Sequence, residues 1–325
     1  MSHLDAQSAV GVGIDRRAIP DSARETFWRA PDGQEIRRID WPCEAQSRGS
    51  LLFLPGRGDF YEKWLDAISH WHDKGWCITA LDWRGQAFSG RMTPDGFTGH
   101  IRDYHIWEGD LEAFWRDWSA SAAGPQVLVA HSMGGLIALG ALAHGLVRPD
   151  AVVFSAPMFG LRPEWLPRWA LHLFARIMVA MRGATTPAWK GAERPDKVPG
   201  DRFHLLTHDE ERYADEAWWR VERPELALGP PSWGWIERSY ASMNEVLPRA
   251  VLEKVRTPVL ILATSADRLV SWRATRKVAD RLANARLVVF GKEARHEILR
   301  EGDAVREAAL ADIDAFLDGA APAGK

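Results

Sequence analysis

Three polar side chains that could together perform nucleophilic catalysis each lie just beyond a short apolar run of the sequence. They are Ser132, Asp267 and His296. A serine hydroxyl becomes an effective nucleophile when a histidine takes its proton and a carboxylate orients that histidine. The chemistry that these residue types support is acyl transfer through the serine oxygen.

Small residues stand two and three positions from Ser132, as a sharp turn between a strand and a helix requires. Ala130 precedes it by two positions, and Gly134 and Gly135 follow it. Such a turn lifts the serine oxygen above a parallel sheet, at a point where strand and helix pass close together. Ala130 stands where a glycine is more usual, which adds a single methyl group. The alternative is that Ser132 only caps the helix that begins at Met133.

The chain order serine, aspartate, histidine is that of α/β-hydrolases and differs from the chymotrypsin and subtilisin orders. Each partner also has a structural alternative, because Asp267 could close a turn and His296 could begin the helix that follows. Ser155 is a weaker nucleophile candidate, since a proline two residues later interrupts the helix that such a turn needs. Two rival acids, Glu297 and Asp303, are interpreted as solvated helix charges.

Acyl transfer also needs hydrogen-bond donors for the developing oxyanion. One donor is expected from the backbone N–H of Met133, directly after the serine. The other is expected from the loop after an early strand, where the apolar run 51–54 leads into the glycine-rich residues 55–58. We assign it to the backbone N–H of Arg57. An ordinary turn at 55–58 is the alternative.

Apolar runs that alternate with helical stretches predict an α/β fold with a mostly parallel central sheet flanked by helices. Residues 25–39 predict a hairpin that turns at 31–33. Further strands are expected at 51–54, 77–81, 127–130, 151–154, 259–263 and 287–290. Helices are expected at 61–74, 103–122, 134–144, 272–283 and 303–317. Residues 1–157 and 251–325 would form this core.

About ninety residues separate two of the predicted strands, and we expect them to form a mainly helical cap segment, residues 158–250, inserted over the carboxyl edge of the sheet. Residues 164–181 are apolar around most of a helix, so they must pack against the core or face lipid. Packing onto the core is the expectation for most of these side chains. The basic residues Arg168, Arg176 and Arg182 are consistent with anionic headgroups and equally with a solvated edge. The cap segment also holds many of the chain's 17 tryptophans.

Six segments resemble the serine α/β-hydrolases of the monoglyceride lipase and lysophospholipase L2 type. They are Leu-Phe-Leu-Pro-Gly-Arg-Gly-Asp-Phe at 52–60, Asp-Trp-Arg-Gly-Gln at 82–86, Val-Ala-His-Ser-Met-Gly-Gly at 129–135, Phe-Ser-Ala-Pro-Met at 154–158, Asp-Arg-Leu-Val at 267–270 and Arg-His-Glu-Ile-Leu at 295–299. Two departures are Pro55 in place of the family's usual histidine and Ala130 in place of its glycine. The proline form is closer to the lysophospholipase L2 branch.

The resemblance implies a serine hydrolase that cleaves carboxylic esters of monoacyl lipids through an acyl-enzyme on Ser132. It also implies substrate contacts at Gly56, Met158 and Val270, and no metal or organic cofactor. Two alternatives stay open. One is a short-chain carboxylesterase or amidase on the same scaffold, because fold and catalytic residues do not set the leaving group. The other is a non-catalytic protein of this fold that only binds a ligand.

Composition supports these expectations and limits the partners. The 325 residues can bury one large core and carry an insertion, and the net charge of −3 gives no reason to expect nucleic acid. With only two cysteines, Cys43 and Cys77, a disulfide framework is not expected, which suits a reducing compartment. The N-terminus shows no basic start followed by a long apolar stretch, so no secretory signal is expected. The expected location is cytoplasmic, with peripheral contact at a membrane through the cap segment, and the oligomeric state is open.

Overall fold

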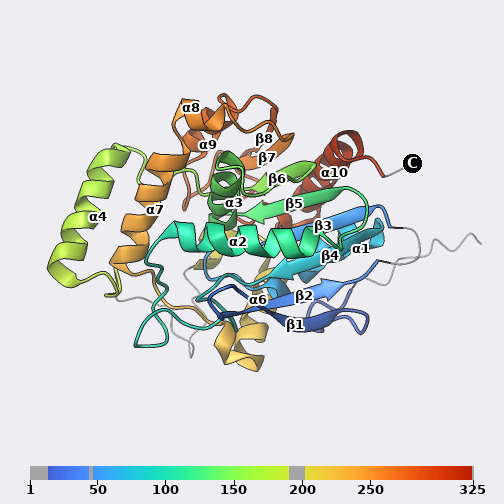
Figure 1. Ribbon diagram of the computed structural model, residues 1–325, viewed down its shortest axis with the longest axis horizontal. Helices are drawn as coiled ribbons and strands as arrows, with labels where there is room; N and C mark the ends of the chain where they lie inside the picture. The colour runs from blue at the N-terminus through green and yellow to red at the C-terminus, as the bar shows by residue number, and fades with distance from the viewer. Residues whose placement is uncertain (1–13, 44–46, 190–201, 324–325) are drawn as a thin grey trace, which may run out of the picture.

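The central feature of the fold is one large, mostly parallel sheet. The computed structural model describes residues 14–43, 47–189 and 202–323, so the residues behind the secretory-signal expectation lie outside it. In the described ranges, eight strands form a sheet in the order β1-β2-β4-β3-β5-β6-β7-β8 (Figure 1). They are β1 (Arg24–Arg29), β2 (Glu35–Trp41), β3 (Gly49–Leu54), β4 (Trp76–Leu81), β5 (Gln126–His131), β6 (Ala151–Ser155), β7 (Val259–Thr264) and β8 (Ala285–Phe290). This confirms the predicted fold class.

The strand sequences explain the direction of each pairing. β1 and β2 form the predicted antiparallel hairpin, β2 pairs antiparallel with β4, and all other neighbours are parallel. The inner parallel strands β3, β5, β6 and β7 are mostly apolar runs, because helices cover both of their faces, whereas β2 carries charged residues. In β3, Leu52 and Leu54 pack into one core cluster, whereas Leu51 and Phe53 pack into the other.

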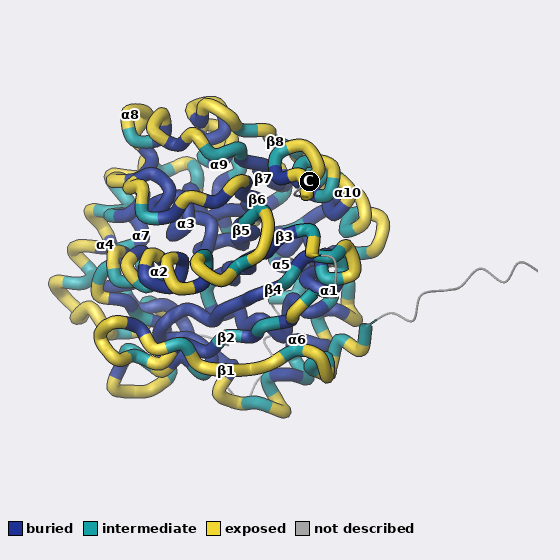
Figure 2. Tube along the Cα trace, turned by 45° about the vertical axis from the view of Figure 1, so that its right-hand side comes forward, coloured by how far each residue is buried: buried dark blue, intermediate teal, exposed yellow. Residues whose placement is uncertain are grey.

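Two helical layers enclose the sheet. The first face is covered by α2 (Tyr104–Ser119), α3 (Met133–Ala143) and α9 (Trp272–Ala279), and the second by η1 (Tyr61–Trp64), α1 (Leu65–Asp73) and α10 (Asp303–Ala320). Figure 2 shows the inner strands β3 to β7 and α3 almost wholly buried between these layers, whereas the edge strand β1 is exposed. The sheet therefore provides a rigid platform for the loops at the carboxyl ends of its parallel strands.

The segment between β6 and β7 carries helices throughout its described part. They are α4 (Arg168–Arg182), α5 (Phe203–Leu206), α6 (Glu210–Glu222), η3 (Pro224–Leu226), α7 (Trp233–Val246) and α8 (Arg249–Leu252). α4 packs along α7 at one end of the molecule (Figure 1). It begins at Arg168 instead of residue 164, because a residue that precedes a proline disfavours helical backbone and Pro167 stands at the N-cap.

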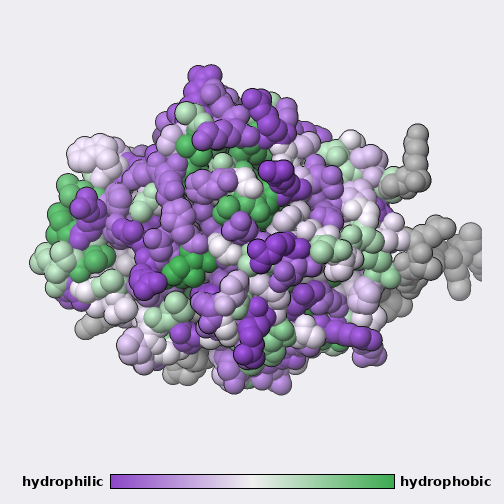
Figure 3. Space-filling model, viewed as in Figure 1, coloured by the Kyte–Doolittle hydropathy of each residue, from purple (hydrophilic) through white to green (hydrophobic). Residues whose placement is uncertain are grey.

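The expectation that most of residues 164–181 pack onto the core is wrong. Within α4 only Ala175 is buried, and large apolar side chains face outward. Trp165 and Trp169 are 80% and 67% exposed. The reason is that, among the described residues, α4 has one neighbouring helix, α7, and no second layer on its other side. Figure 3 shows the resulting hydrophobic surface at the end of the molecule where α4 lies.

The two cysteines are joined by a disulfide between Cys43 and Cys77, contrary to the sequence-based expectation. The sheet register brings them together, since Trp41 of β2 pairs with Ile78 of β4 and the cysteines lie just beyond this pair. Nothing in their spacing along the chain signals this proximity. The argument for a reducing compartment that rested on unpaired cysteines therefore no longer holds.

None of the helices in the described part of the chain combines the length and the apolarity needed to cross a bilayer.

Candidate active site

Ser132 lies at a strained turn between β5 and α3. Its backbone has φ +49° and ψ −115°, a conformation that costs a non-glycine residue of order 1–3 kcal/mol and tends to occur at functional sites. A methyl group at Gly134 would lie 2.5 Å from the carbonyl oxygen of Pro55, so the close approach demands glycine there. The Ser132 side chain makes no capping hydrogen bond to α3, and the helix-cap alternative therefore does not account for it.

The three residues singled out in the sequence meet at this turn. Ser132 Oγ lies 3.0 Å from His296 Nε2, and His296 Nδ1 lies 2.8 Å from Asp267 Oδ2. All three side chains are buried. His296 belongs to the loop after β8, ahead of η4 (Ile298–Arg300), and does not begin a helix. The structure thus brings together residues that are separated by up to 164 positions in the chain.

Backbone groups fix the carboxylate of Asp267. Its Oδ1 accepts hydrogen bonds from the backbone N–H groups of Leu269 and Val270, at 2.8 and 2.9 Å. This leaves Oδ2 directed at the imidazole. Asp267 therefore closes a turn and also orients His296, so the two sequence-based roles are compatible. Arg162 adds a further support, because its Nη2 donates to the carbonyl oxygen of Asp267 at 2.7 Å.

Burial and neighbouring charges shift the pKa values of His296, Asp267 and His131. Burial lowers the pKa of His296, but the charge and hydrogen bond of Asp267 outweigh burial and raise this pKa above its ordinary value. Burial raises the pKa of Asp267, and the interactions with His296 outweigh it, so the carboxyl pKa is lowered. The neighbouring His131, with its ring centroid 4.9 Å from that of His296, is different. Burial, opposed in part by Asp59, lowers the pKa of His131 to about 3, so this ring stays neutral.

The loop after β3 passes directly over the serine. A methyl group at Gly56 would lie 3.0 Å from Ser132 Cβ, and the Gly56 N–H donates to Asp59 Oδ2 at 2.9 Å. The next residue, Arg57, holds its guanidinium against the cap segment, where it bonds the carbonyl oxygen of Gly229. Met133, the first residue of α3, follows Ser132. The two backbone groups assigned to the oxyanion thus belong to segments that meet at Ser132.

A buried cluster of charged side chains lies beside the histidine. Lys63 Nζ lies 2.7 Å from Asp59, 3.0 Å from Glu216 and 2.5 Å from Glu297. Arg300 bonds both Glu216 and Glu297. The interpretation of Glu297 as a solvated helix charge is therefore wrong, because two buried cations hold it away from water. The cluster joins η1 of the core to α6 of the cap segment.

The other rival groups lie elsewhere. Asp303 is at the exposed start of α10, where its carboxylate pairs with Arg212 at 2.7 Å. Ser155 ends β6, and its carbonyl oxygen accepts a hydrogen bond from the Ser132 N–H. Neither offers an arrangement like that around Ser132.

A cavity of about 460 Å³ opens above Ser132 and His296. Met158 and Val270, two of the three residues that the family resemblance assigned to substrate contact, line this cavity, whereas Gly56 is not part of the lining. One part of the wall is apolar, with Leu161, Trp235 and Ile236 among others. Such a volume and lining are typical of small-molecule sites.

Sequence reasoning missed the polar part of this wall. Lys63, Glu216 and Arg220 reach it from the charged cluster, and Arg268 lies at its exposed edge. No spacing signal connects Lys63 with Glu216, since they come from the core and from the cap segment. Arg268 could have been noticed, because it directly follows Asp267.

Comparisons with known proteins agree with this arrangement. Residues 45–303 match the Hydrolase_4 family, described as serine aminopeptidase, S33. The chain is 30% identical over 318 residues to lysophospholipase L2 of Escherichia coli K12, covering 92% of this chain and 91% of that protein. It is 27% identical to the probable lysophospholipase L2 of Haemophilus influenzae, covering 85% of each chain.

A soluble variant of monoglyceride lipase from Saccharomyces cerevisiae has the same fold, with a TM-score of 0.75, 18% identity, and coverage of 93% of this chain and 97% of that one. The sheet order, the turn at Ser132 and the match over most of the sequence lead to one conclusion: the chain belongs to the serine aminopeptidase S33 family of α/β-hydrolases.

Proposed function

We propose that this protein is a serine hydrolase that cleaves the carboxylic ester of monoacyl lipids, of the lysophospholipid type, through an acyl-enzyme on Ser132. The observation that carries the proposal is the chain of contacts from Ser132 Oγ to His296 to Asp267 at the floor of the cavity. The similarity to lysophospholipase L2 supports it. Residues 158–250 act in this account as the cap of the site.

The reaction begins when His296 Nε2 takes the proton of Ser132 as its oxygen attacks the ester carbonyl. Asp267 keeps the proton of His296 on Nδ1 and stabilises the imidazolium that forms. The imidazolium then protonates the departing alcohol, which leaves the acyl group on Ser132. Water, activated by the same Nε2, releases the fatty acid and restores the serine.

The backbone N–H groups of Met133 and Arg57 hold the oxyanion of each tetrahedral intermediate. Met133 supports this role because its N–H begins α3 directly beside the nucleophile. The close approach of Gly56 to Ser132 supports the role of Arg57, the next residue. Donors fixed by the backbone stabilise the developing charge without having to reorganise during the reaction.

The cavity favours a substrate with one acyl chain and a polar headgroup. Its apolar wall suits a hydrocarbon chain, and arginines occupy other parts of the lining. Most of these are engaged: Arg162 bonds the Asp267 carbonyl, and Arg220 lies 2.7 Å from Glu216. Arg268 is exposed at the edge, and within the described residues none of the hydrogen bonds or ion pairs involves its side chain. We assign Arg268 to the phosphate of a lysophospholipid.

The exposed face of α4 is suited to contact with the lipid aggregate that holds the substrate. Trp169, Leu173, Ile177 and Met181 recur every four residues along α4, and all four are exposed, so they form one apolar stripe. The exposed arginines 168, 176 and 182 lie on the same helix. An apolar face with basic residues binds anionic lipid surfaces.

A substrate panel tests the proposal. Wild type is expected to hydrolyse lysophosphatidylcholine and monoacylglycerol of equal chain length, and Ser132→Ala to lose both activities. Arg268→Gln is expected to raise KM for the lysophospholipid severalfold and to leave KM for the monoacylglycerol unchanged. The matched control Arg276→Gln removes an exposed positive charge of α9 that does not line this cavity, and it should alter neither value.

Other outcomes would replace the proposal. Activity confined to acetyl or butyryl esters would indicate a short-chain carboxylesterase, and preferred cleavage of acyl amides would indicate an amidase. Binding of the lipids without any turnover by the wild type would indicate a ligand-binding protein.

A further inference from the structure

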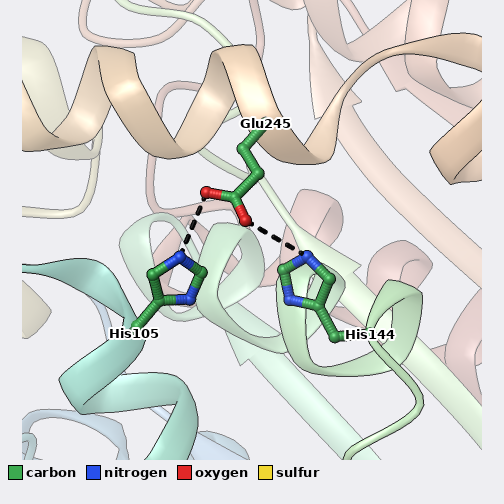
Figure 4. A group of neighbouring side chains, drawn as sticks. All are labelled: His105, His144 and Glu245. Carbon is green, nitrogen blue, oxygen red and sulfur yellow. Dashed lines mark hydrogen bonds and ion pairs between the residues drawn. The ribbon is translucent and has the colours of Figure 1, made fainter.

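A second group of histidines and carboxylates lies on the surface, between the core and the cap segment. His105 comes from α2, His144 follows the last residue of α3, and Glu245 comes from α7 (Figure 4). Glu245 lies 3.1 Å from His105 Nε2 through one oxygen and 3.6 Å from His144 Nε2 through the other. The nitrogen and carboxylate atoms that could bind a metal all lie within 4.8 Å of one another.

A buried carboxylate orients both imidazole rings. Glu108 Oε2 lies 3.2 Å from His105 Nδ1 and 2.9 Å from His144 Nδ1, and the side chain of Glu108 is only 2% exposed. A methyl group at Gly140 would collide with this carboxylate, so the glycine leaves the space that Glu108 occupies. A carboxylate behind the Nδ1 atom is the usual support of a metal-binding histidine.

The orientation leaves three acceptors facing one another. When Glu108 accepts the Nδ1–H of both neutral rings, each Nε2 carries a lone pair directed toward the oxygens of Glu245. Lone pairs and a carboxylate repel one another, so either a metal ion or a proton on each ring must lie between them. The distances from Glu245 to the two Nε2 atoms, 3.1 and 3.6 Å, are near those of a metal site, since metal–ligand distances of about 2.0–2.2 Å place the ligand atoms of a tetrahedral site about 3.3–3.6 Å apart.

We propose that His105, His144 and Glu245 bind a divalent first-row transition-metal ion such as Zn²⁺, with Glu108 as the positioning residue for both histidines. Two imidazoles and one carboxylate are ligands that Zn²⁺ prefers, and the exposed side of the cluster leaves room for a water as fourth ligand. Because two ligands belong to core helices and the third to α7, the ion would tie the cap segment to the core. The family resemblance led the sequence analysis to expect no metal, and these three residues are far apart in the chain and form no spacing motif that would have indicated one.

Calorimetric titration of the tag-free, chelator-treated protein with Zn²⁺ tests the proposal, with the thermal unfolding midpoint Tm as an independent readout. Wild type should bind one ion with the highest affinity and gain Tm when it binds. His105→Asn, His144→Asn and Glu245→Gln should each lose this site and the gain in Tm. Glu108→Gln should keep the ligands and weaken binding by about 10–100-fold.

The matched control is His70→Asn. His70 Nε2 lies 2.8 Å from Asp314, so it forms a histidine–carboxylate pair of similar kind without a second histidine ligand. This variant should bind Zn²⁺ as the wild type does. The proposal is overturned if the wild type shows no binding, or if the variants of the cluster bind and gain Tm like the His70 variant. In that case protonated histidines pair with the two glutamates, and no metal ion is needed to hold the cluster.

Discussion

Helices α3 and α4 are both rich in apolar residues, yet they have opposite environments. All eleven residues of α3 are buried, whereas only Ala175 is buried among the fifteen of α4. α3 lies between the sheet and its helical neighbours and begins at the strained Ser132. α4 is covered on one side by α7 and exposes its apolar face on the other (Figure 2). The comparison shows a sealed core beside an exposed apolar helix, and it agrees with the proposed division in which the core performs the chemistry and the cap segment meets lipid.

The largest expected effect is the loss of kcat when Asp267 of the core is replaced, compared with replacement of the exposed Asp303. Asp267→Asn should lower kcat by about 10⁴-fold, because the amide no longer holds His296 in the required tautomer. Asp303→Asn, which alters an exposed ion pair at the start of α10, should leave kcat unchanged. Steady-state kinetics on one soluble ester measures both. Similar losses in the two variants would contradict the division.

The junction between the two regions should be sensitive to loss of its buried cation. Lys63→Met leaves Asp59, Glu216 and Glu297 with fewer cations in a buried place, and it should lower the free energy of unfolding by about 3–5 kcal/mol. Lys74→Met is the control, since Lys74 is 52% exposed and pairs with Asp314 at 3.7 Å. Its cost should stay below about 1 kcal/mol. Urea denaturation measures both values, and equal costs would argue against a buried junction.

The pH dependence of kcat/KM should be set by His296 in the core and should not depend on the cap segment. Catalysis needs neutral His296, and the raised pKa of this group means that activity is lost as pH falls through a value above the ordinary 6.5. Below that value kcat/KM should fall about tenfold per pH unit. The double variant Trp165→Ser/Trp169→Ser should show the same fall of kcat/KM at low pH when a soluble ester is the substrate. If kcat/KM falls only below pH 6.5, or if the pH of this fall changes in the tryptophan variant, His296 is not the group that controls activity.

The smallest effect concerns the cap segment. The same tryptophan variant should bind anionic vesicles about fivefold to tenfold more weakly, because two exposed aromatic side chains no longer enter the interface. Phe27→Ser on β1 removes another exposed aromatic residue, 55% exposed, and should bind as the wild type does. Vesicle co-sedimentation measures both. If the two variants bind alike, α4 does not form the lipid contact.

Much of the core could be predicted because its signals are local. The alternation of apolar runs and helices gave the strand positions within a few residues, and the small residues around Ser132 gave the turn. The order of Ser132, Asp267 and His296 then followed from where each strand ends. These features depend on near neighbours in the chain.

The errors concern relations that only the folded chain creates. The sheet register joins Cys43 to Cys77, and Lys63 meets Glu216 across the junction of core and cap segment. Glu297 looked solvated because its burial depends on distant cations. Whether an apolar helix such as α4 is covered depends on the layers outside it, which composition does not reveal.

The most direct test of the account is the site of covalent modification by a long-chain fluorophosphonate, mapped by mass spectrometry of the digested protein. The account predicts one adduct, on the peptide that contains Ser132, in the wild type and none in Ser132→Ala. An adduct on another serine such as Ser155, or equal labelling of the two proteins, would contradict it.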